Sequence, residues 1–179
     1  MVLVTPRLRL RPWRESDLEP FAAMNADARV MAHFPKPLAR AESDAMAERA
    51  QASLASRGWG LWAMELAGEE RFIGFAGLAV PSWQAHFTPC VEIGWRLCAE
   101  AWGKGYATEA ARAALRYGFE KVGLAEIVSY TSLANARSIA VMERLGMHRD
   151  GEFDHPMIAE GHRLRRHLLY RLSSRHEAA

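Results

Sequence analysis

The segment Ala101–Gly123, AWGKGYATEAARAALRYGFEKVG, constrains the fold more than any other part of the chain. Two glycines flank Lys104, and an alanine-rich stretch with helical spacing follows directly. Glycine tolerates positive φ angles, so Gly103 and Gly105 suit a tight turn between a strand and a helix. They also suit an anion site, because glycines let a phosphate approach the unpaired N–H groups at a helix N-terminus. The spacing alone leaves both interpretations open.

Composition narrows the class of protein. The 179 residues carry a net charge of +2, half of them are hydrophobic and a quarter are charged, which is ordinary for a globular domain. We expect one domain over the whole chain, with a core from about residue 5 to about residue 173. The small net charge argues against a nucleic-acid partner, and the basic segment near the C-terminus alternates like a half-polar strand.

Other features bear on location and metal content. The N-terminus has no long apolar core, and the uncharged stretch Phe72–Val91 is interrupted by prolines and polar residues, so we expect no secretory signal and no membrane association. Cys90 and Cys98 lack the spacing of a zinc site or a disulfide framework. Free thiols are usual in a reducing compartment, so the sequence favours a cytoplasmic protein without a metal site.

The hydrophobic pattern predicts a mixed α/β fold around one sheet, with no internal repeat and no linker. A capping-box spacing in Ser16–Glu19 predicts that the first helix starts there. Further helices are expected over Ala41–Ser56, from the glycine pair to near Gly123, and over Asn135–Gly146. Strands are expected at Arg7–Trp13, Trp59–Leu66, Phe72–Val80, Val91–Cys98, Glu126–Leu133, Arg149–Phe153 and Leu164–Leu172.

Two common phosphate-binding motifs do not fit the glycine pair. A P-loop requires a glycine, four residues and then Gly-Lys-Ser/Thr, and nothing in the chain matches that pattern. A dinucleotide fingerprint requires a third glycine where Thr108 stands, and its strand–helix unit normally comes early in the chain. If the glycine pair binds an anion, the ligand therefore belongs to another class.

A second motif, NARSIAVMERLGM, begins at Asn135. Together with VEIGWRLCAEAWGKGYATEA it resembles the GNAT acetyltransferase superfamily, and specifically the branch of the RimJ/RimL ribosomal-protein N-acetyltransferases. The resemblance extends from TPRLRLRPW to LLYRL. It implies a central, mostly antiparallel, splayed sheet of about seven strands flanked by about four helices. One departure is Trp102, which stands first in the family's Gln/Arg-x-x-Gly-x-Gly/Ala pattern, whereas Gly105 and Ala107 keep the other two places.

The resemblance implies acetyl-CoA as the co-substrate. Backbone amides from Gly103 to Thr108 would bind its pyrophosphate, and the strand end Trp95–Leu97 would pair its backbone with the pantetheine arm. The Lys104 side chain can assist at the phosphates, although a lysine in a turn is more often simply solvated. The expected cofactor-binding residues are Trp95, Arg96, Leu97, Trp102, Gly103, Lys104, Gly105, Tyr106, Ala107, Thr108, Asn135 and Ser138.

Glu92 is the first candidate for a general base. It interrupts an apolar strand and points to the opposite face, together with Gly94 and Arg96. A carboxylate at a cleft floor can have a raised pKa and accept a proton through water. The strand also resembles the one that carries the base glutamate in histone-type members of the superfamily. The alternative is a solvated charge, or one that neighbours Arg96 and orients structure.

Asn135 and Ser138 have both a structural and a functional interpretation. The first can simply cap its helix, and the second can be an exposed hydroxyl in the first turn. The resemblance implies instead that Asn135 bonds to the pantetheine or to nearby backbone. It also implies that Ser138 donates a hydrogen bond to the departing CoA sulfur. Many relatives use a tyrosine for that task, and Met142 stands at its place here.

Several other side chains are weaker candidates. Asp154 and His155 lie in a loop after the last helix and can face an acceptor site, although a lone histidine is more often structural. Large aromatic residues usually belong to the core but can also wall a pocket. The residues concerned are Trp13, Trp59, Trp62 and Trp83.

The sequence thus predicts an acetyl-CoA-dependent N-acetyltransferase that acts on a primary amine, either a small molecule or a protein N-terminus. Direct transfer in a ternary complex is favoured because neither cysteine has an activating partner nearby in the sequence. The alternative is a non-catalytic acyl-CoA-binding or regulatory module with the same fold. The acceptor, and the choice between a monomer and a homodimer, are left open.

Overall fold

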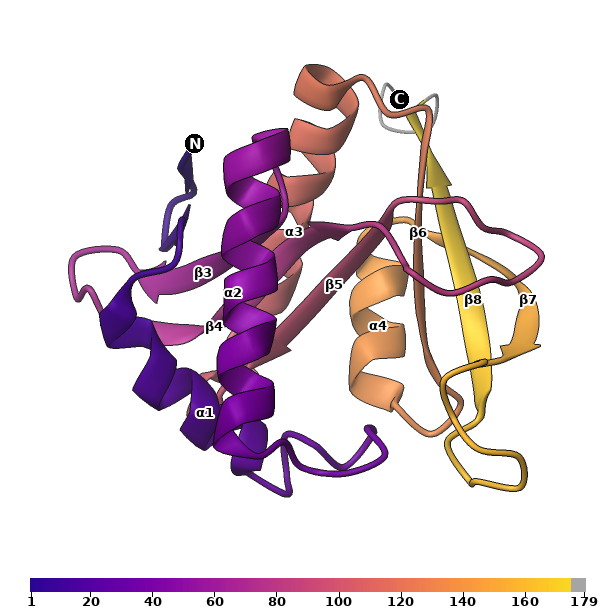
Figure 1. The fold of residues 1–179 in the computed structure, drawn as a ribbon. Coiled ribbons are helices and arrows are strands. Elements are labelled where there is room, and N and C mark those ends of the chain that lie inside the picture. Colours follow the sequence, from indigo (N-terminus) through magenta and orange to yellow (C-terminus); the bar gives the residue numbers. More distant parts are fainter. Residues whose placement is uncertain (175–179) are drawn as a thin grey trace.

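The computed structural model describes residues 1–174. Its strands form one sheet of eight, in the order β1-β2-β3-β4-β5-β6-β8-β7 (Figure 1). All neighbouring strands are antiparallel except β5 and β6, which confirms the expected mixed α/β, mostly antiparallel architecture. The strands are β1 (Leu3–Val4), β2 (Leu8–Arg11), β3 (Leu61–Leu66), β4 (Phe72–Ala79), β5 (Glu92–Leu97), β6 (Glu126–Ser132), β7 (His148–Asp154) and β8 (Arg166–Ser173).

The sheet has one strand more than the sequence predicts. The additional strand, β1, contains only two residues and pairs with β2 at the edge of the sheet. Such a short segment cannot show the alternation by which a strand is recognised in a sequence.

Four α-helices accompany the sheet within the described residues, as expected. They are α1 (Leu18–Ala26), α2 (Arg40–Arg57), α3 (Tyr106–Tyr117) and α4 (Ala136–Arg144). A π turn, Gly118–Val122, prolongs α3 as far as Gly123, whose φ of 76° ends it as the sequence indicated. Within the same part of the chain, no helix combines the length and apolar character that crossing a bilayer requires.

The first helix begins within Ser16–Glu19 as predicted, but Ser16 does not cap it. A 3-10 turn, Glu15–Asp17, precedes α1. The N-cap residue of α1 is Asp17 rather than Ser16. The Asp17 carboxylate accepts a hydrogen bond from the Arg14 backbone N–H at 2.8 Å. It also binds the buried Arg11 guanidinium at 2.6 and 2.8 Å. This buried ion pair joins residues six apart in the chain and holds the turn, and the spacing in Ser16–Glu19 does not reveal it.

The helices cover the two faces of the sheet separately. Helices α1 and α2 lie on one face and α3 on the other (Figure 1). On the α3 face, alanines of α3 and Met142 of α4 pack against alternate strand residues such as Leu78 and Ile93. On the α1 face, Phe21 and Ala47 pack with Phe75. Each face therefore has its own apolar core, as a two-layer packing requires.

The sheet opens between β5 and β6. These two strands are parallel and pair only at Glu92↔Val128, after which they diverge. Beyond that pair, the Ser129 hydroxyl donates to the Ile93 carbonyl at 3.0 Å, so a side chain replaces a backbone bond. Because the strands separate here, the sheet offers a passage between its two faces.

Candidate active site

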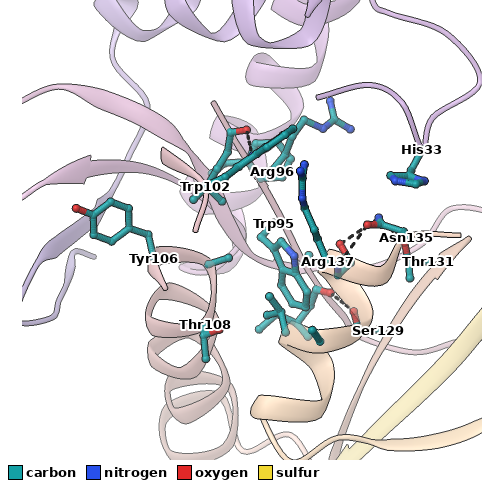
Figure 2. A pocket seen from close by; sticks show the side chains of 18 of the residues that line it. His33, Trp95, Arg96, Trp102, Tyr106, Thr108, Ser129, Thr131, Asn135 and Arg137 are labelled. Atoms are coloured by element: carbon teal, nitrogen blue, oxygen red, sulfur yellow. Dashed lines mark hydrogen bonds between the residues drawn. The ribbon is translucent and has the colours of Figure 1, made fainter. Parts of the chain in front are cut away.

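A cleft of about 1780 Å³ occupies this opening. Its walls come from β5, β6, the first turns of α3 and α4, the loop between α1 and α2, and the loop after β7. In Figure 2, Trp95 projects between α3 and α4, while His33 approaches from the loop that follows α1. The cleft therefore gathers residues that are far apart in the sequence.

The glycine pair forms one wall of the cleft. Gly103 and Gly105 have φ angles of 74° and 79°, a region that side chains other than glycine disfavour. A Cβ at Gly103 would meet nothing within 4 Å, and one at Gly105 would come within 3.4 Å of the Arg7 guanidinium only. No side chain caps α3 within residues 1–174, and its first turn lines the cleft. This geometry suits an anion, because the unpaired N–H groups at an uncapped helix N-terminus can donate hydrogen bonds to it.

Hydrogen bonds from the residues just before β2 hold this loop in place. The Glu109 carboxylate accepts hydrogen bonds from Thr5 Oγ1 at 2.7 Å and from Arg7 N and Nε at 3.0 and 2.6 Å. Arg7 Nη1 in turn donates to the Lys104 carbonyl at 2.9 Å. The Lys104 residue is exposed, so its backbone is held while its side chain stays accessible to solvent. These contacts fix the loop before any ligand arrives.

The β5 strand presents an unpaired edge to the cleft. N–H and C=O groups of alternate residues point to the same side of a strand. The Val91 carbonyl accepts a backbone bond from β6, and the Ile93 carbonyl accepts the Ser129 hydroxyl. Trp95 is next in this alternation and lies beyond the last β5–β6 pair, so its backbone groups face the opening. Those of Arg96 face β4, although its side chain lines the cleft.

Trp102 contacts the C-terminal end of this open edge of β5. Its indole N–H donates to the Leu97 carbonyl at 3.0 Å, which satisfies the next outward-facing backbone acceptor of β5. The Arg137 guanidinium lies over the Trp102 ring, 4.2 Å from the ring centre. The tryptophan at the position where the sequence departs from the family pattern thus joins β5 to the start of α4.

Asn135 and Ser138 form one hydrogen-bonded unit at the start of α4. Asn135 Oδ1 accepts from the Ser138 backbone N–H at 3.3 Å, so Asn135 caps the helix. Its Nδ2 donates to Thr131 Oγ1 at 2.8 Å and to Ser138 Oγ at 3.1 Å (Figure 2). Because the Ser138 oxygen already accepts a hydrogen bond, its own O–H proton is available for another acceptor in the cleft.

Glu92 lines the cleft, at the position where β5 pairs with β6. The side chain is half-buried, and burial raises the pKa of its carboxyl to about 7. A carboxyl group with that pKa is divided between its protonated and ionised forms near neutral pH. It can therefore take up a proton and release it again under ordinary conditions.

His155 also lines the cleft, near His167 of β8. Burial, followed by the nearby His167, lowers the pKa of His155 to about 4, so its ring is neutral at pH 7. Its Nδ1 accepts from the Met157 backbone N–H at 3.2 Å. Asp154 is exposed and paired with Arg166 at 3.2 Å, so it does not contribute to the cleft.

The four tryptophans considered as pocket walls do not line the cleft. Trp13 and Trp62 are buried in the two cores. Trp59 lies beneath Arg57, and Trp83 packs against His155 with ring centres 4.7 Å apart. The aromatic residues that line the cleft are others, among them Trp95 and Trp102.

The cysteines are free and lie outside the cleft lining. Burial raises the pKa of each thiol to about 11, and neighbouring carboxylates add to the effect. At neutral pH both are protonated and are weak nucleophiles. Residues 1–174 also contain no group of three or more His, Cys, Asp or Glu side chains arranged to hold a metal ion.

Comparison with protein-family models identifies the chain. Residues 7–148 match the model of the acetyltransferase (GNAT) domain. The chain belongs to the GNAT acetyltransferase family. The matched segment contains the glycine pair, the open edge of β5 and the Asn135–Ser138 unit. His155 and His167 of the cleft lie beyond it.

Individual relatives agree with this assignment. The uncharacterized protein YkkB of Bacillus subtilis is 33% identical over 147 residues, which are 82% of this chain and 84% of that protein. An FsC-acetyl coenzyme A-N(2)-transacetylase of Aspergillus fumigatus is 40% identical over 94 residues, 50% of this chain and 39% of that protein. The crystal structure of a GNAT-family acetyltransferase from Bacillus anthracis is 26% identical, with a TM-score of 0.81 over 98% of this chain and 99% of that one.

The finer branch within the family stays a prediction. A structure of RimL in complex with coenzyme A has a TM-score of 0.76 over 97% of this chain and 98% of that one. Its sequence identity is 15%, which shows a shared fold alone.

The GNAT cleft also contains residues that sequence reasoning missed. Ser129 and Thr131 alternate along β6, a signal that places two hydroxyls on one face of a predicted strand. His33 gives no such signal, since it lies in an irregular loop that only the tertiary fold brings to the cleft. Its Nδ1 is buried without a hydrogen-bond partner among residues 1–174, and burial lowers its pKa. Arg137 is recognisable only through its contact with Trp102.

Proposed function

We propose that this GNAT domain transfers an acetyl group from acetyl-CoA directly to a primary amine. The observation that carries the proposal is the passage between β5 and β6. It joins an uncapped helix N-terminus to a half-buried carboxyl group whose pKa is about 7. A thioester whose CoA part binds at the start of α3 can then meet an amine that lies next to Glu92.

The acetyl-CoA site would use the α3 face of the cleft. The N–H groups after Gly103 would bind the pyrophosphate, and the outward backbone groups of Trp95 would pair with the pantetheine amides, as an added strand does. Asn135 is already engaged with Thr131 and Ser138, so it would act chiefly by orienting the Ser138 hydroxyl. These assignments follow from the free donors and acceptors that the cleft presents.

The reaction would need one proton acceptor and one stabilised leaving group. The neutral amine attacks the thioester carbonyl carbon, a C–N bond forms, and the C–S bond breaks as the tetrahedral intermediate collapses. Glu92, directly or through water, would accept the proton that the nitrogen loses. The Ser138 hydroxyl would donate to the departing sulfur as negative charge develops on it. Direct transfer is favoured over an acetyl-enzyme because both cysteines are protonated and lie outside the cleft lining.

The acceptor is a primary amine, with a small molecule and a protein N-terminus as the two candidates. The name of the Aspergillus relative, an acetyl coenzyme A N(2)-transacetylase, supports acetyl transfer to nitrogen. RimL is named as an α-N-protein acetyltransferase, but its distance from this chain makes a protein acceptor one option among several.

A turnover screen tests the proposal. Purified protein with acetyl-CoA is assayed for thiol release against small amines, polyamines and N-terminal peptides, and the acetylated product is identified by mass spectrometry. We expect acetylation of at least one class of amine, and a rise in thermal stability with acetyl-CoA alone. At a concentration 100 times its Kd, a ligand adds about 2.7 kcal/mol to the free energy of unfolding. Stabilisation by acetyl-CoA without acetylation of any amine would favour the non-catalytic alternative.

A further inference from the structure

Arg96 is held in a fixed position at the wall of the cleft, on the α1 face. Its guanidinium carbon lies over two phenyl rings, 4.0 Å from the centre of Phe34 and 5.5 Å from that of Phe75. One nitrogen, Nη1, donates to Asn25 Oδ1 at 2.6 Å, and Asn25 Nδ2 donates to Ser43 Oγ at 2.8 Å. Asn25 and Ser43 are fully buried, so this chain of bonds orients the guanidinium rigidly.

The charge of this guanidinium is not balanced by an acidic partner. Within residues 1–174, no carboxylate pairs with Arg96, and its buried Nε atom has no hydrogen-bond partner. Burial lowers its pKa to about 10, with no nearby charge acting in either direction, so it remains cationic at neutral pH. Arg11 offers a contrast, because this buried arginine binds both Asp17 and Glu65, at 2.6 and 2.5 Å. A half-buried cation without an anion is costly unless a ligand supplies one.

The position of Arg96 relative to Glu92 defines what that ligand can be. The two residues are four apart on β5, so their side chains lie on the same face of the sheet. At about 3.3 Å per residue, their Cα atoms are about 13 Å apart. An amine beside Glu92 and an anion beside Arg96 therefore cannot belong to one short α-amino acid, whose two groups are separated by a single carbon.

We propose that Arg96 binds a carboxylate of the acceptor molecule, and that several bonds separate this carboxylate from the amine that is acetylated. Only Nη1 of this planar guanidinium has a hydrogen-bond partner within residues 1–174, and the residue lines the cleft. A guanidinium with unpaired N–H groups suits a carboxylate, which it can bind through two parallel hydrogen bonds. Arg96 is in this role a specificity-determining residue for the acceptor. The inference rests on the proposed function, since it takes the amine to lie next to Glu92.

Two other roles for Arg96 are less consistent with the geometry. The phosphates of CoA are expected at the glycine pair, whereas the Arg96 side chain packs on the α1 face among Phe34, Phe75 and Asn25. A purely structural role accounts for the bond to Asn25. It does not account for the unpartnered Nε or for the absence of an acidic partner within residues 1–174.

Binding of a matched pair of probes tests the proposal. The protein is saturated with CoA, which cannot transfer an acetyl group, and titrated by calorimetry with 6-aminohexanoate and with 6-aminohexanamide. These probes share an amine and a chain length and differ only in the carboxylate. We expect the carboxylate to bind about 10- to 100-fold more tightly, the range for hydrogen bonds to a charged group. Arg96→Gln should remove this preference and Arg96→Lys should retain part of it.

Controls separate the ligand role from a structural one. Arg71→Gln removes an exposed arginine that pairs with Glu69 outside the cleft, and should leave the preference unchanged. Affinity of Arg96→Gln for CoA reports whether that variant is folded. Equal binding of both probes to the parent, binding of neither, or a preference that survives in Arg96→Gln would overturn the proposal.

The same probes, offered with acetyl-CoA, distinguish this inference from the proposed function. A carboxylate preference in binding, without acetylation of any amine in the screen, would support the role of Arg96 and contradict the transferase. Acetylation with no difference between carboxylate and carboxamide would support the transferase and overturn the role of Arg96.

Discussion

Replacing Glu92 by glutamine should stabilise the protein and inactivate it. Burial raises the pKa of Glu92 from 4.5 to about 7, so its ionised form is disfavoured in the folded protein. At 1.36 kcal/mol per pKa unit, this shift corresponds to about 3 kcal/mol of lost stability once the carboxylate is fully ionised. Glutamine keeps the size of the side chain but carries no charge, so the variant should recover up to that amount above pH 8.

The size of this stability difference should increase with pH. Between pH 4.5 and about 7 the folded protein binds more protons at Glu92 than the unfolded chain does, because the folded pKa is higher. The contribution of Glu92 to stability therefore falls as pH rises through this window. Parent and Glu92→Gln should be equally stable below pH 4.5 and diverge up to pH 8. Comparing the two proteins cancels the histidines, which titrate identically in both.

Urea unfolding from pH 5 to 8.5 measures the divergence, with Glu120→Gln as a control. Glu120 is exposed on the π turn after α3, and its substitution should change the free energy of unfolding by less than about 0.5 kcal/mol. The same proteins are also assayed for activity across this pH range. For the parent, kcat/KM should increase with pH and reach a plateau above pH 7. That of Glu92→Gln should be lower by about 10²- to 10⁴-fold. A Glu92→Gln variant no more stable than the parent at pH 8.5, with the parent's pH–rate profile, would refute the reasoning.

Three further substitutions test other parts of the cleft. Gly105→Val should abolish CoA binding in calorimetry, since the side chain would crowd the phosphates. Gly123→Val, with a similar φ of 76° and open space around it, is the matched control for backbone strain and should still bind CoA. Ser138→Ala should lower kcat by about 10²-fold while changing acetyl-CoA affinity little, because the hydroxyl acts on charge that develops at the sulfur. An unchanged kcat would make Ser138 an ordinary first-turn serine. His155→Gln should reduce the loss of stability on acidification from pH 6.5 to 4, measured by urea unfolding. The folded pKa of about 4 lies below the usual 6.5, so folding resists protonation in that window. Parallel pH curves for the parent and His155→Gln would exclude this contribution.

The sequence by itself determined much of the secondary structure and the position of the glycine pair. Helices α2, α3 and α4 and seven of the eight strands follow from periodicity and from caps such as Asn135, because these are local properties of a few consecutive residues. The position of Glu92 and Arg96 on one strand face follows equally from the period of two in a β-strand. Local rules placed the start of α1 correctly within Ser16–Glu19 but indicated the wrong capping residue, because a buried ion pair between Arg11 and Asp17 holds the preceding turn.

Only the tertiary structure decided which of these residues act together. The parting of β5 from β6 after Glu92 depends on how two distant strands pair, and no local pattern encodes it. The raised pKa of Glu92 and the unbalanced charge of Arg96 likewise depend on what packs against them, because desolvation is set by neighbours in space. His33 reaches the cleft from a loop whose course depends on the packing of α1 and α2. A sequence specifies such long-range contacts only through the whole fold, so the cleft could be described only once that fold was known.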